Sequence, residues 1–154
     1  MKHIAVTDLS VGTLKRYWAE LNEAIPSFPA DLQRYVHDCG LHDAYFVEAH
    51  SDLAGQSLTL EFIGDCMSDD IPHSFARRFR FSYSGVASFG FRGVKDAGGF
   101  PRPTDLEYVD HDRLTRISAE YIEHRIVFYL GADFTVRFRD FKLWYEDFEF
   151  IPVA

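Results

Sequence analysis

The sequence predicts an α+β fold in which two N-terminal helices pack on a mainly antiparallel β-sheet of about seven to nine strands. Apolar residues recur every three or four positions up to residue 40, and from residue 41 they alternate with a period of two. The strand-like segments also follow one another too closely for the crossovers that parallel strands need. A chain of 154 residues has the usual size of one domain. We therefore expect a single domain over residues 1–154, helical over 8–40 and β-sheet over 41–151.

Two short helices open the predicted fold. The apolar stripe of the first, predicted over residues 11–25, comprises Val11, Leu14, Trp18, Leu21 and Ile25. Ser10 or Asp8 is expected to cap its start. Pro26 breaks the chain, Pro29 suits the first turn of a second helix, and Gly40 is placed to end that helix.

The rest of the chain alternates apolar and polar residues in a series of short segments. The predicted strands are residues 45–49, 58–63, 79–83, 86–92, 117–121, 126–130, 134–138 and 141–145. Segments 51–55 and 131–133 contain the small polar residues and glycine that turns favour. Strands this close in sequence are expected to be antiparallel neighbours, with 86–92 beside the strand before it. Residues 64–72 and the glycine- and proline-rich residues 93–103 are predicted to be loops.

The composition favours some classes of partner and disfavours others. The chain has 16 Lys and Arg against 24 Asp and Glu, a formal net charge of −8. This charge opposes binding to nucleic-acid backbones and to anionic membrane surfaces, and it speeds encounter with a basic protein. Because the sequence has neither a signal peptide nor an apolar run long enough to span a bilayer, we expect a cytoplasmic protein. Cys39 and Cys66 are expected to be reduced.

Sequence motifs that would indicate an enzyme are missing. The chain has no phosphate-binding glycine loop, no dinucleotide fingerprint, no His-Glu-x-x-His and no Cys-x-x-Cys. Their absence favours a protein that is not an enzyme and that carries no cofactor. His37, His42 and His111 are spaced too irregularly to predict a metal site, so we expect them to be scattered surface histidines.

The most suggestive polar cluster is Leu41-His42-Asp43-Ala44, where the second helix gives way to the first strand. In a functional interpretation, Asp43 orients the imidazole of His42, which acts as a base or ligand. In a structural interpretation, both side chains hydrogen-bond to nearby backbone and fix the junction. We favour the structural interpretation, because no second catalytic group can be placed beside them.

Basic residues alternate with apolar residues on several of the predicted strands. They are Arg77, Arg78, Arg80, Arg137, Arg139 and Lys142. Side by side they would form an anion-binding surface. The alternation is more typical of the solvent-facing side of half-buried strands, so we expect ion pairs with acidic residues such as Glu120.

A second candidate binding surface lies near the C-terminus. Most aromatic residues here are expected to belong to the core of the sheet. Trp144 is the exception, because it lies on the strand face opposite Leu143. Together with Tyr145, Trp144 can supply buried contact area to a partner. The carboxylates of Glu146, Asp147 and Glu149 would form an acidic rim around these anchors.

Two stretches of the chain resemble a loosely defined group of small bacterial β-rich domains. One is the Leu41-His42-Asp43-Ala44 strand opening with residues 57–62, and the other runs from residues 122–128 to 136–141. Some domains of similar appearance are grouped with the immunity proteins of bacterial toxin systems. The resemblance, which covers residues 41 to 146 or thereabouts, implies a domain that binds and blocks a partner protein.

We therefore expect a non-enzymatic, acidic protein-binding domain of the immunity-like type, whose partner is a basic protein such as a toxin. The alternative is a small-molecule-binding protein or enzyme that uses His42 and Asp43 in a pocket between helices and sheet. A self-associating structural component is a third hypothesis, and the sequence does not predict the oligomeric state.

Overall fold

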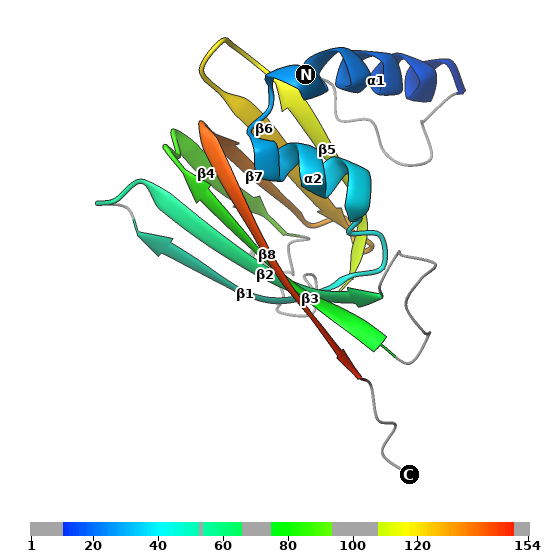
Figure 1. Ribbon diagram of the computed structural model, residues 1–154, viewed down its shortest axis with the longest axis vertical. Helices are drawn as coiled ribbons and strands as arrows, with labels where there is room; N and C mark the ends of the chain where they lie inside the picture. The colour runs from blue at the N-terminus through cyan, green and yellow to red at the C-terminus, as the bar shows by residue number, and fades with distance from the viewer. Residues whose placement is uncertain (1–10, 53, 66–74, 94–107, 150–154) are drawn as a thin grey trace.

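A computed structural model describes residues 11–52, 54–65, 75–93 and 108–149 (Figure 1). Within these residues it contains two α-helices, one turn of 3-10 helix and eight strands, which confirms the α+β class. The helical elements are α1 (Val11–Ala24), η2 (Ile25–Ser27) and α2 (Ala30–Asp38). The strands are β1 (Tyr45–Asp52), β2 (Ser57–Asp65), β3 (Phe75–Ser84), β4 (Ser88–Arg92), β5 (Val109–Arg116), β6 (Ile122–Phe128), β7 (Asp133–Phe138) and β8 (Asp140–Glu149).

Both predicted helices are present, and proline separates them. Pro26 lies in the 3-10 turn that ends α1, and Pro29 is the N-cap of α2. The chain leaves α2 through Cys39, whose backbone is extended and whose N–H bonds to the carbonyl of Tyr35. Gly40 is not in the left-handed conformation that the predicted glycine cap uses. The predicted caps Ser10 and Asp8 lie outside the described residues.

The eight strands are divided between two four-stranded antiparallel sheets instead of forming one. The first has the order β1-β2-β3-β8 and the second the order β4-β7-β6-β5. The hairpin of β1 and β2 is confirmed, as is the antiparallel pairing of β6 with β7. Strand β5 was not predicted, and it pairs with β6. The expected pairing of the strands over residues 134–138 and 141–145 is wrong, because β7 and β8 lie in different sheets. The prediction that residues 86–92 pair with the strand before them is wrong, because β4 pairs with β7 in the other sheet.

The two sheets share one sharply bent corner. Here β3 continues into β4 through Gly85, and β7 continues into β8 through Arg139. The two connections are hydrogen-bonded to each other, from Arg139 N to Ser84 O (3.1 Å) and from Ala87 N to Arg137 O (2.9 Å). Gly85 has a φ of 60°, and a Cβ on it would lie 2.9 Å from the Cβ of Arg139. Only glycine fits this corner without strain.

The predicted strand over residues 117–121 is wrong. The hydroxyl of Ser118 accepts hydrogen bonds from the backbone N–H groups of Glu120 (3.2 Å) and Tyr121 (3.0 Å). These local bonds replace the ladder and turn the chain between β5 and β6. The guanidinium of Arg116 strengthens the turn by donating to the carbonyl of Ser118 (3.1 Å).

The core lies between the two sheets and is rich in aromatic residues. Tyr83 of β3 meets Phe138 of β7 with ring centroids 4.9 Å apart, so the inner faces of the sheets are in contact. Tyr35 of α2 reaches the same core, with its ring 5.0 Å from that of Phe81. Figure 1 shows α2 beside β8 and α1 near the end of β5, and contacts between these pairs of elements agree with that view.

The basic residues on the strand faces form ion pairs, as expected. Arg139 lies 3.2 Å from Glu120, and Arg137 lies 3.0 Å from Glu123. Arg78 pairs with Glu61, which is buried in the outer face of the first sheet. These pairs explain the alternation without an anion site.

Several predictions fall outside the described residues. Residues 66–74, which include most of one predicted loop and Cys66, are not described, and neither are residues 94–107. Cys39 is a free thiol, and burial raises the pKa of this group.

Candidate functional site

The residues singled out in the sequence fall in two separate places. His42 and Asp43 lie in the turn before β1, and His42 also lines a cavity. Trp144, Tyr145, Glu146, Asp147 and Glu149 lie on β8. The structure therefore presents two candidate sites.

The turn formed by residues 41–44 is held by backbone hydrogen bonds. The N–H of Ala44 donates to the carbonyl of Leu41 (2.8 Å), and the N–H of Asp43 donates to the carbonyl of Val109 (2.9 Å). Asp43 has a φ of 62°, a left-handed conformation that aspartate tolerates better than most residues. The turn therefore ties the start of β1 to the start of β5.

The side chains of the same turn make local contacts. Nδ1 of His42 lies 2.7 Å from the carbonyl oxygen of Asp110, so that nitrogen carries a proton and donates it. Nε2 of His42 lies 3.4 Å from Asp43, whose carboxylate accepts a hydrogen bond from the Tyr129 hydroxyl. This bond to Asp43 raises the pKa of Tyr129 to about 12. Both His42 and Asp43 are exposed, and their contacts join this turn to Asp110 and Tyr129.

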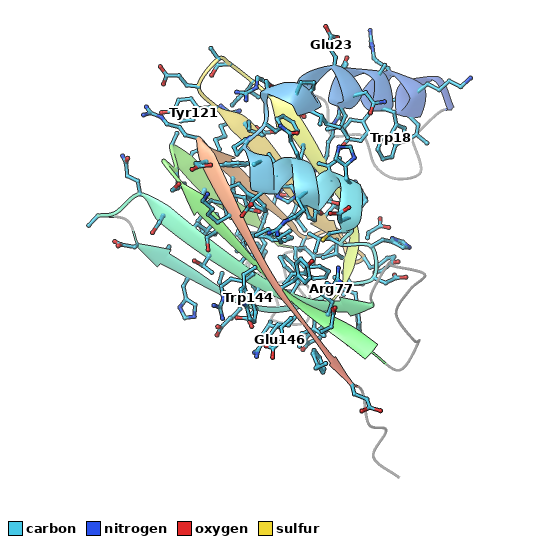
Figure 2. All side chains as sticks on the ribbon, viewed as in Figure 1. Trp18, Glu23, Arg77, Tyr121, Trp144 and Glu146 are labelled. Carbon is cyan, nitrogen blue, oxygen red and sulfur yellow. The ribbon has the colours of Figure 1, made fainter. Side chains whose placement is uncertain are left out.

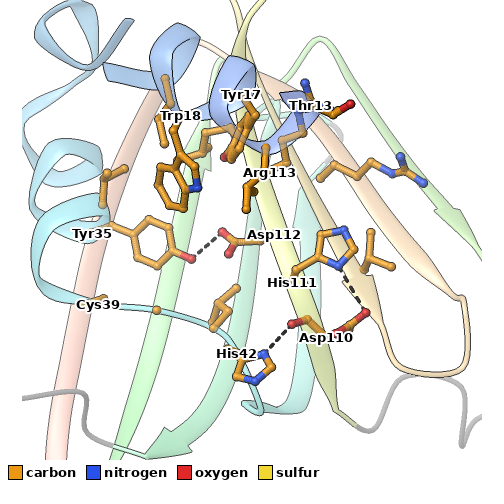
Figure 3. Close-up of a pocket in the computed structure, with 18 residues that line it drawn as sticks. Thr13, Tyr17, Trp18, Tyr35, Cys39, His42, Asp110, His111, Asp112 and Arg113 are labelled. Carbon is orange, nitrogen blue, oxygen red and sulfur yellow. Dashed lines mark hydrogen bonds and ion pairs between the residues drawn. The ribbon is translucent and has the colours of Figure 1, made fainter. Parts of the chain in front are cut away.

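A cavity of about 340 Å³ opens beside this turn, between α1, the end of α2 and the edge of β5. Its apolar wall comes mainly from the helices, through Leu14, Trp18, Leu21 and Val36. Its polar wall is the run of β5 from Asp110 to Arg113. Figure 3 shows Tyr17 and Trp18 at one end of the cavity and His42 and Asp110 at the other. This is a helix–sheet pocket with His42 at its rim.

A buried polar network backs the cavity wall, and the sequence analysis missed it. Oδ2 of Asp112 accepts hydrogen bonds from the Tyr35 hydroxyl (2.5 Å) and from Nε2 of His124 (2.7 Å). Nδ1 of His124 lies 2.7 Å from the Tyr83 hydroxyl. With Nε2 of His124 protonated, the Tyr83 hydroxyl donates to Nδ1, and each of these three contacts has one donor and one acceptor.

Burial dominates the electrostatics of this network. His124 is fully buried, and Tyr35 and Tyr83 are nearly so. Desolvation of the phenolate, reinforced by the charge of Asp112, raises the pKa of both tyrosines well above the usual value. The alternation in residues 122–128 does place His124 on the same face as three apolar residues, and this signal could have shown that it is buried.

The second candidate site lies on β8, an edge strand of the first sheet. At Leu143, α2 covers this edge, because Asp31 accepts from the Leu143 N–H (2.9 Å) and Arg34 donates to the Leu143 carbonyl (2.8 Å). From Trp144 to Glu149 every residue of the strand is exposed. The edge is therefore protected in its first half and open in its second.

The pleat of β8 separates the predicted binding residues. Trp144 and Glu146 lie on the outer face of the sheet, whereas Tyr145, Asp147 and Glu149 point to the opposite side. Figure 2 shows Trp144 and Glu146 around the exposed half of β8. The structure thus arranges the five residues along one edge, not on one face.

Arginines of β3 hold these side chains in place. The guanidinium of Arg80 lies 4.8 Å from the ring centre of Trp144, and that of Arg77 lies 4.2 Å from the ring centre of Tyr145. Arg77, which is buried, also makes two bonds to Asp147 of 2.6 and 3.0 Å. Asp147 is therefore part of the structure of the strand pair, while Glu146 and Glu149 project into solvent.

No protein-family model matches the chain, and no curated protein matches it. One similar solved structure is the crystal structure of an uncharacterized protein from Neisseria gonorrhoeae, with 14% sequence identity and a TM-score of 0.43. The match covers 66% of this chain and 90% of that chain.

The described residues contain neither a metal-binding cluster nor a membrane-spanning helix. In these residues no group of three or more His, Cys, Asp and Glu side chains is arranged to hold a metal ion. Neither described helix is long and apolar enough to cross a membrane.

Proposed function

We propose that the chain is a non-enzymatic protein-binding domain of the immunity-like type, which docks a basic partner protein along the open half of β8. One observation carries the proposal. Residues Trp144–Glu149 form an exposed edge strand with three aromatic side chains and three carboxylates. Exposed aromatic side chains within a charged rim are typical of protein interfaces.

The geometry of the edge favours docking by strand addition. Because the backbone groups of Leu143 point toward α2, those of Tyr145, Asp147 and Glu149 point to the same side. Within the described residues no other strand pairs with that side of β8. An extended partner segment can therefore pair with the backbone while meeting side chains on both sides of the pleat.

The aromatic anchors are held before a partner arrives. Arg80 over Trp144 and Arg77 over Tyr145 restrict two large side chains, so less conformational entropy is lost on binding. Trp144 retains 41% of its surface exposed, which leaves contact area to bury.

Charge supports a basic partner. The net charge of −8 raises the rate of encounter with a positively charged protein, and Glu146 and Glu149 add carboxylates at the edge itself. A basic active site covered by this edge would be blocked without any reaction. This mode of action agrees with the resemblance to bacterial domains grouped with immunity proteins.

The test begins with a pull-down from bacterial lysate at low salt, followed by binding kinetics with the purified partner. We expect Trp144→Ala to weaken binding by about tenfold or more, because a central aromatic anchor is lost. The matched control is Trp18→Ala on α1, an exposed tryptophan away from β8, which should bind like the wild type.

Charge reversal at two positions tests whether the carboxylates of the edge speed the encounter with the partner. Glu146→Lys with Glu149→Lys should slow association at low salt, whereas Glu20→Lys with Glu23→Lys on α1 makes the same change of net charge away from the edge. Equal association rates for the two double variants, or full affinity in Trp144→Ala, would exclude this edge. A particle mass of two chains that falls to one in Trp144→Ala would indicate self-association instead.

A further inference from the structure

We propose that the cavity between α1, the end of α2 and β5 is a binding site for a small organic anion, a carboxylate with an aromatic or aliphatic body. This site is independent of the protein-binding edge, because none of the residues that line it belongs to β8.

The cavity has the volume and the combination of apolar and polar walls that such a ligand needs. Its volume of about 340 Å³ falls within the range of pockets that hold small molecules. Leu14 and Trp18 of α1 are large apolar side chains that remain about half exposed, and both line the cavity. Val36 of α2 lines it as well. These side chains can bury the body of a ligand.

The edge of β5 supplies backbone groups to the same cavity. At one end, the Asp110 carbonyl is bound by His42, and at the other, the Leu114 N–H donates to the Tyr17 hydroxyl (3.3 Å). Asp112 lies between them, and the alternation of an antiparallel ladder points its N–H and carbonyl to that side as well. A ligand can therefore be oriented by one backbone donor and one backbone acceptor.

The charged groups of the wall favour an anion. Both carboxylates already have donors, since Asp112 accepts from Tyr35 and His124 and Asp110 lies 3.4 Å from Nδ1 of His111. Arg113 has no ion pair among the residues that the structure describes. Its guanidinium carbon lies 4.8 Å from the centre of the Tyr17 ring.

The position of Arg113 makes a negative ligand favourable. It lies directly opposite Arg125 across the β5–β6 pair, and like charges in this arrangement repel. Arg125 is compensated by Asp133, which lies 2.8 Å from its Nη2. Nε of Arg113, like Nε of Arg125, is buried with no hydrogen bond among the described residues. A carboxylate bound to Arg113 would satisfy a buried donor and offset the repulsion.

Two series of probes with matched bodies test the charge preference by calorimetry on the full chain. They are indole-3-acetate, indole-3-ethanol and tryptamine, and octanoate, octanol and octylamine. We expect the carboxylate to bind at least about tenfold more tightly than the alcohol and the amine in at least one series. Preference for the amine would assign the site to Asp110 and Asp112 and overturn the proposal. Equal binding of all three members, or no binding at millimolar concentration, would overturn it too.

A variant pair then tests the assignment to Arg113. Arg113→Met keeps the apolar stem and should reduce carboxylate affinity by about tenfold or more while leaving affinity for the alcohol unchanged. Arg16→Met, on the exposed face of α1, is the control and should change neither. Unchanged carboxylate affinity in Arg113→Met, with a circular dichroism spectrum like that of the wild type, would overturn the proposal.

Discussion

The buried network around Asp112 should contribute measurably to stability, and a double-mutant cycle with Tyr35 isolates one of its bonds. Tyr35→Phe removes a hydroxyl that donates to a carboxylate over 2.5 Å. A hydrogen bond to a charged group contributes about 1.5–3 kcal/mol. Because the side chain of Asp112 is 19% exposed and water can replace part of the bond, we expect a loss near the lower limit, about 1.5 kcal/mol.

Asp112→Ala should cost more, because it deprives two buried donors of their acceptor. Each unsatisfied buried group costs about 1–3 kcal/mol, so the loss of the partner of Tyr35 and His124 should cost about 3 kcal/mol. In the double variant, Tyr35 no longer has a hydroxyl to leave unsatisfied. The double variant should therefore be about 1–2 kcal/mol more stable than the two single effects predict together.

Urea unfolding followed by far-UV circular dichroism measures these free energies, provided that the slope of unfolding free energy against urea is unchanged in all variants. If the two substitutions add within about 0.5 kcal/mol, Tyr35 and Asp112 are not coupled. The reasoning about the network would then be wrong.

Three other predictions concern separate features. Burial raises the folded-state pKa values of Tyr17, Tyr35 and Tyr83 above the unfolded value near 10, so above pH 10 these tyrosines lose their protons only in the unfolded state. The free energy of unfolding should therefore fall above pH 10 by about 1.4 kcal/mol per pH unit for each of them. Tyr83→Phe should lower that slope in alkaline denaturation curves, and an unchanged slope would contradict the assignment. Asp147→Ala should lower the free energy of unfolding in urea by about 2 kcal/mol, because it removes two bonds to buried Arg77. The exposed control Glu149→Ala should lower it by less than about 0.5 kcal/mol. Equal losses in the two variants would contradict a structural role for Asp147. Asp43→Val should be less stable than Asp43→Asn by about 1–2 kcal/mol in thermal unfolding, since a branched side chain is strained at a φ of 62°, and equal stability would show that the turn is not left-handed.

Local patterns in the sequence predicted most of the elements but not their partners. The stripe from Val11 to Ile25 and the alternation in residues 45–63 depend on neighbours along the chain, and both elements are present. Whether β4 pairs with β3 or with β7 depends on the corner at Gly85, where the chain crosses to the other sheet. Periodicity carries no information about such a crossing.

In the candidate sites, too, the sequence predicted local features but not the contacts between distant segments. The alternation on β8 correctly placed Trp144 opposite Leu143, yet it did not show that Asp147 would be bound by a buried arginine from β3. The cavity was anticipated as a helix–sheet pocket near His42, but its polar wall comes from residues 110–113, which are distant in sequence. Side chains that are distant in sequence and meet only in the folded chain have no fixed spacing, so no sequence motif identifies them.

The bent corner also determines how the protein unfolds. One ribbon of chain, β3 with β4 against β8 with β7, belongs to both sheets, so neither sheet can open without disturbing the other. Amide hydrogens of β2 in one sheet and β6 in the other should therefore exchange with solvent through the same global opening and with similar protection. In energetic terms we expect the two sheets to behave as a single cooperative unit, joined where the connections at Gly85 and Arg139 meet.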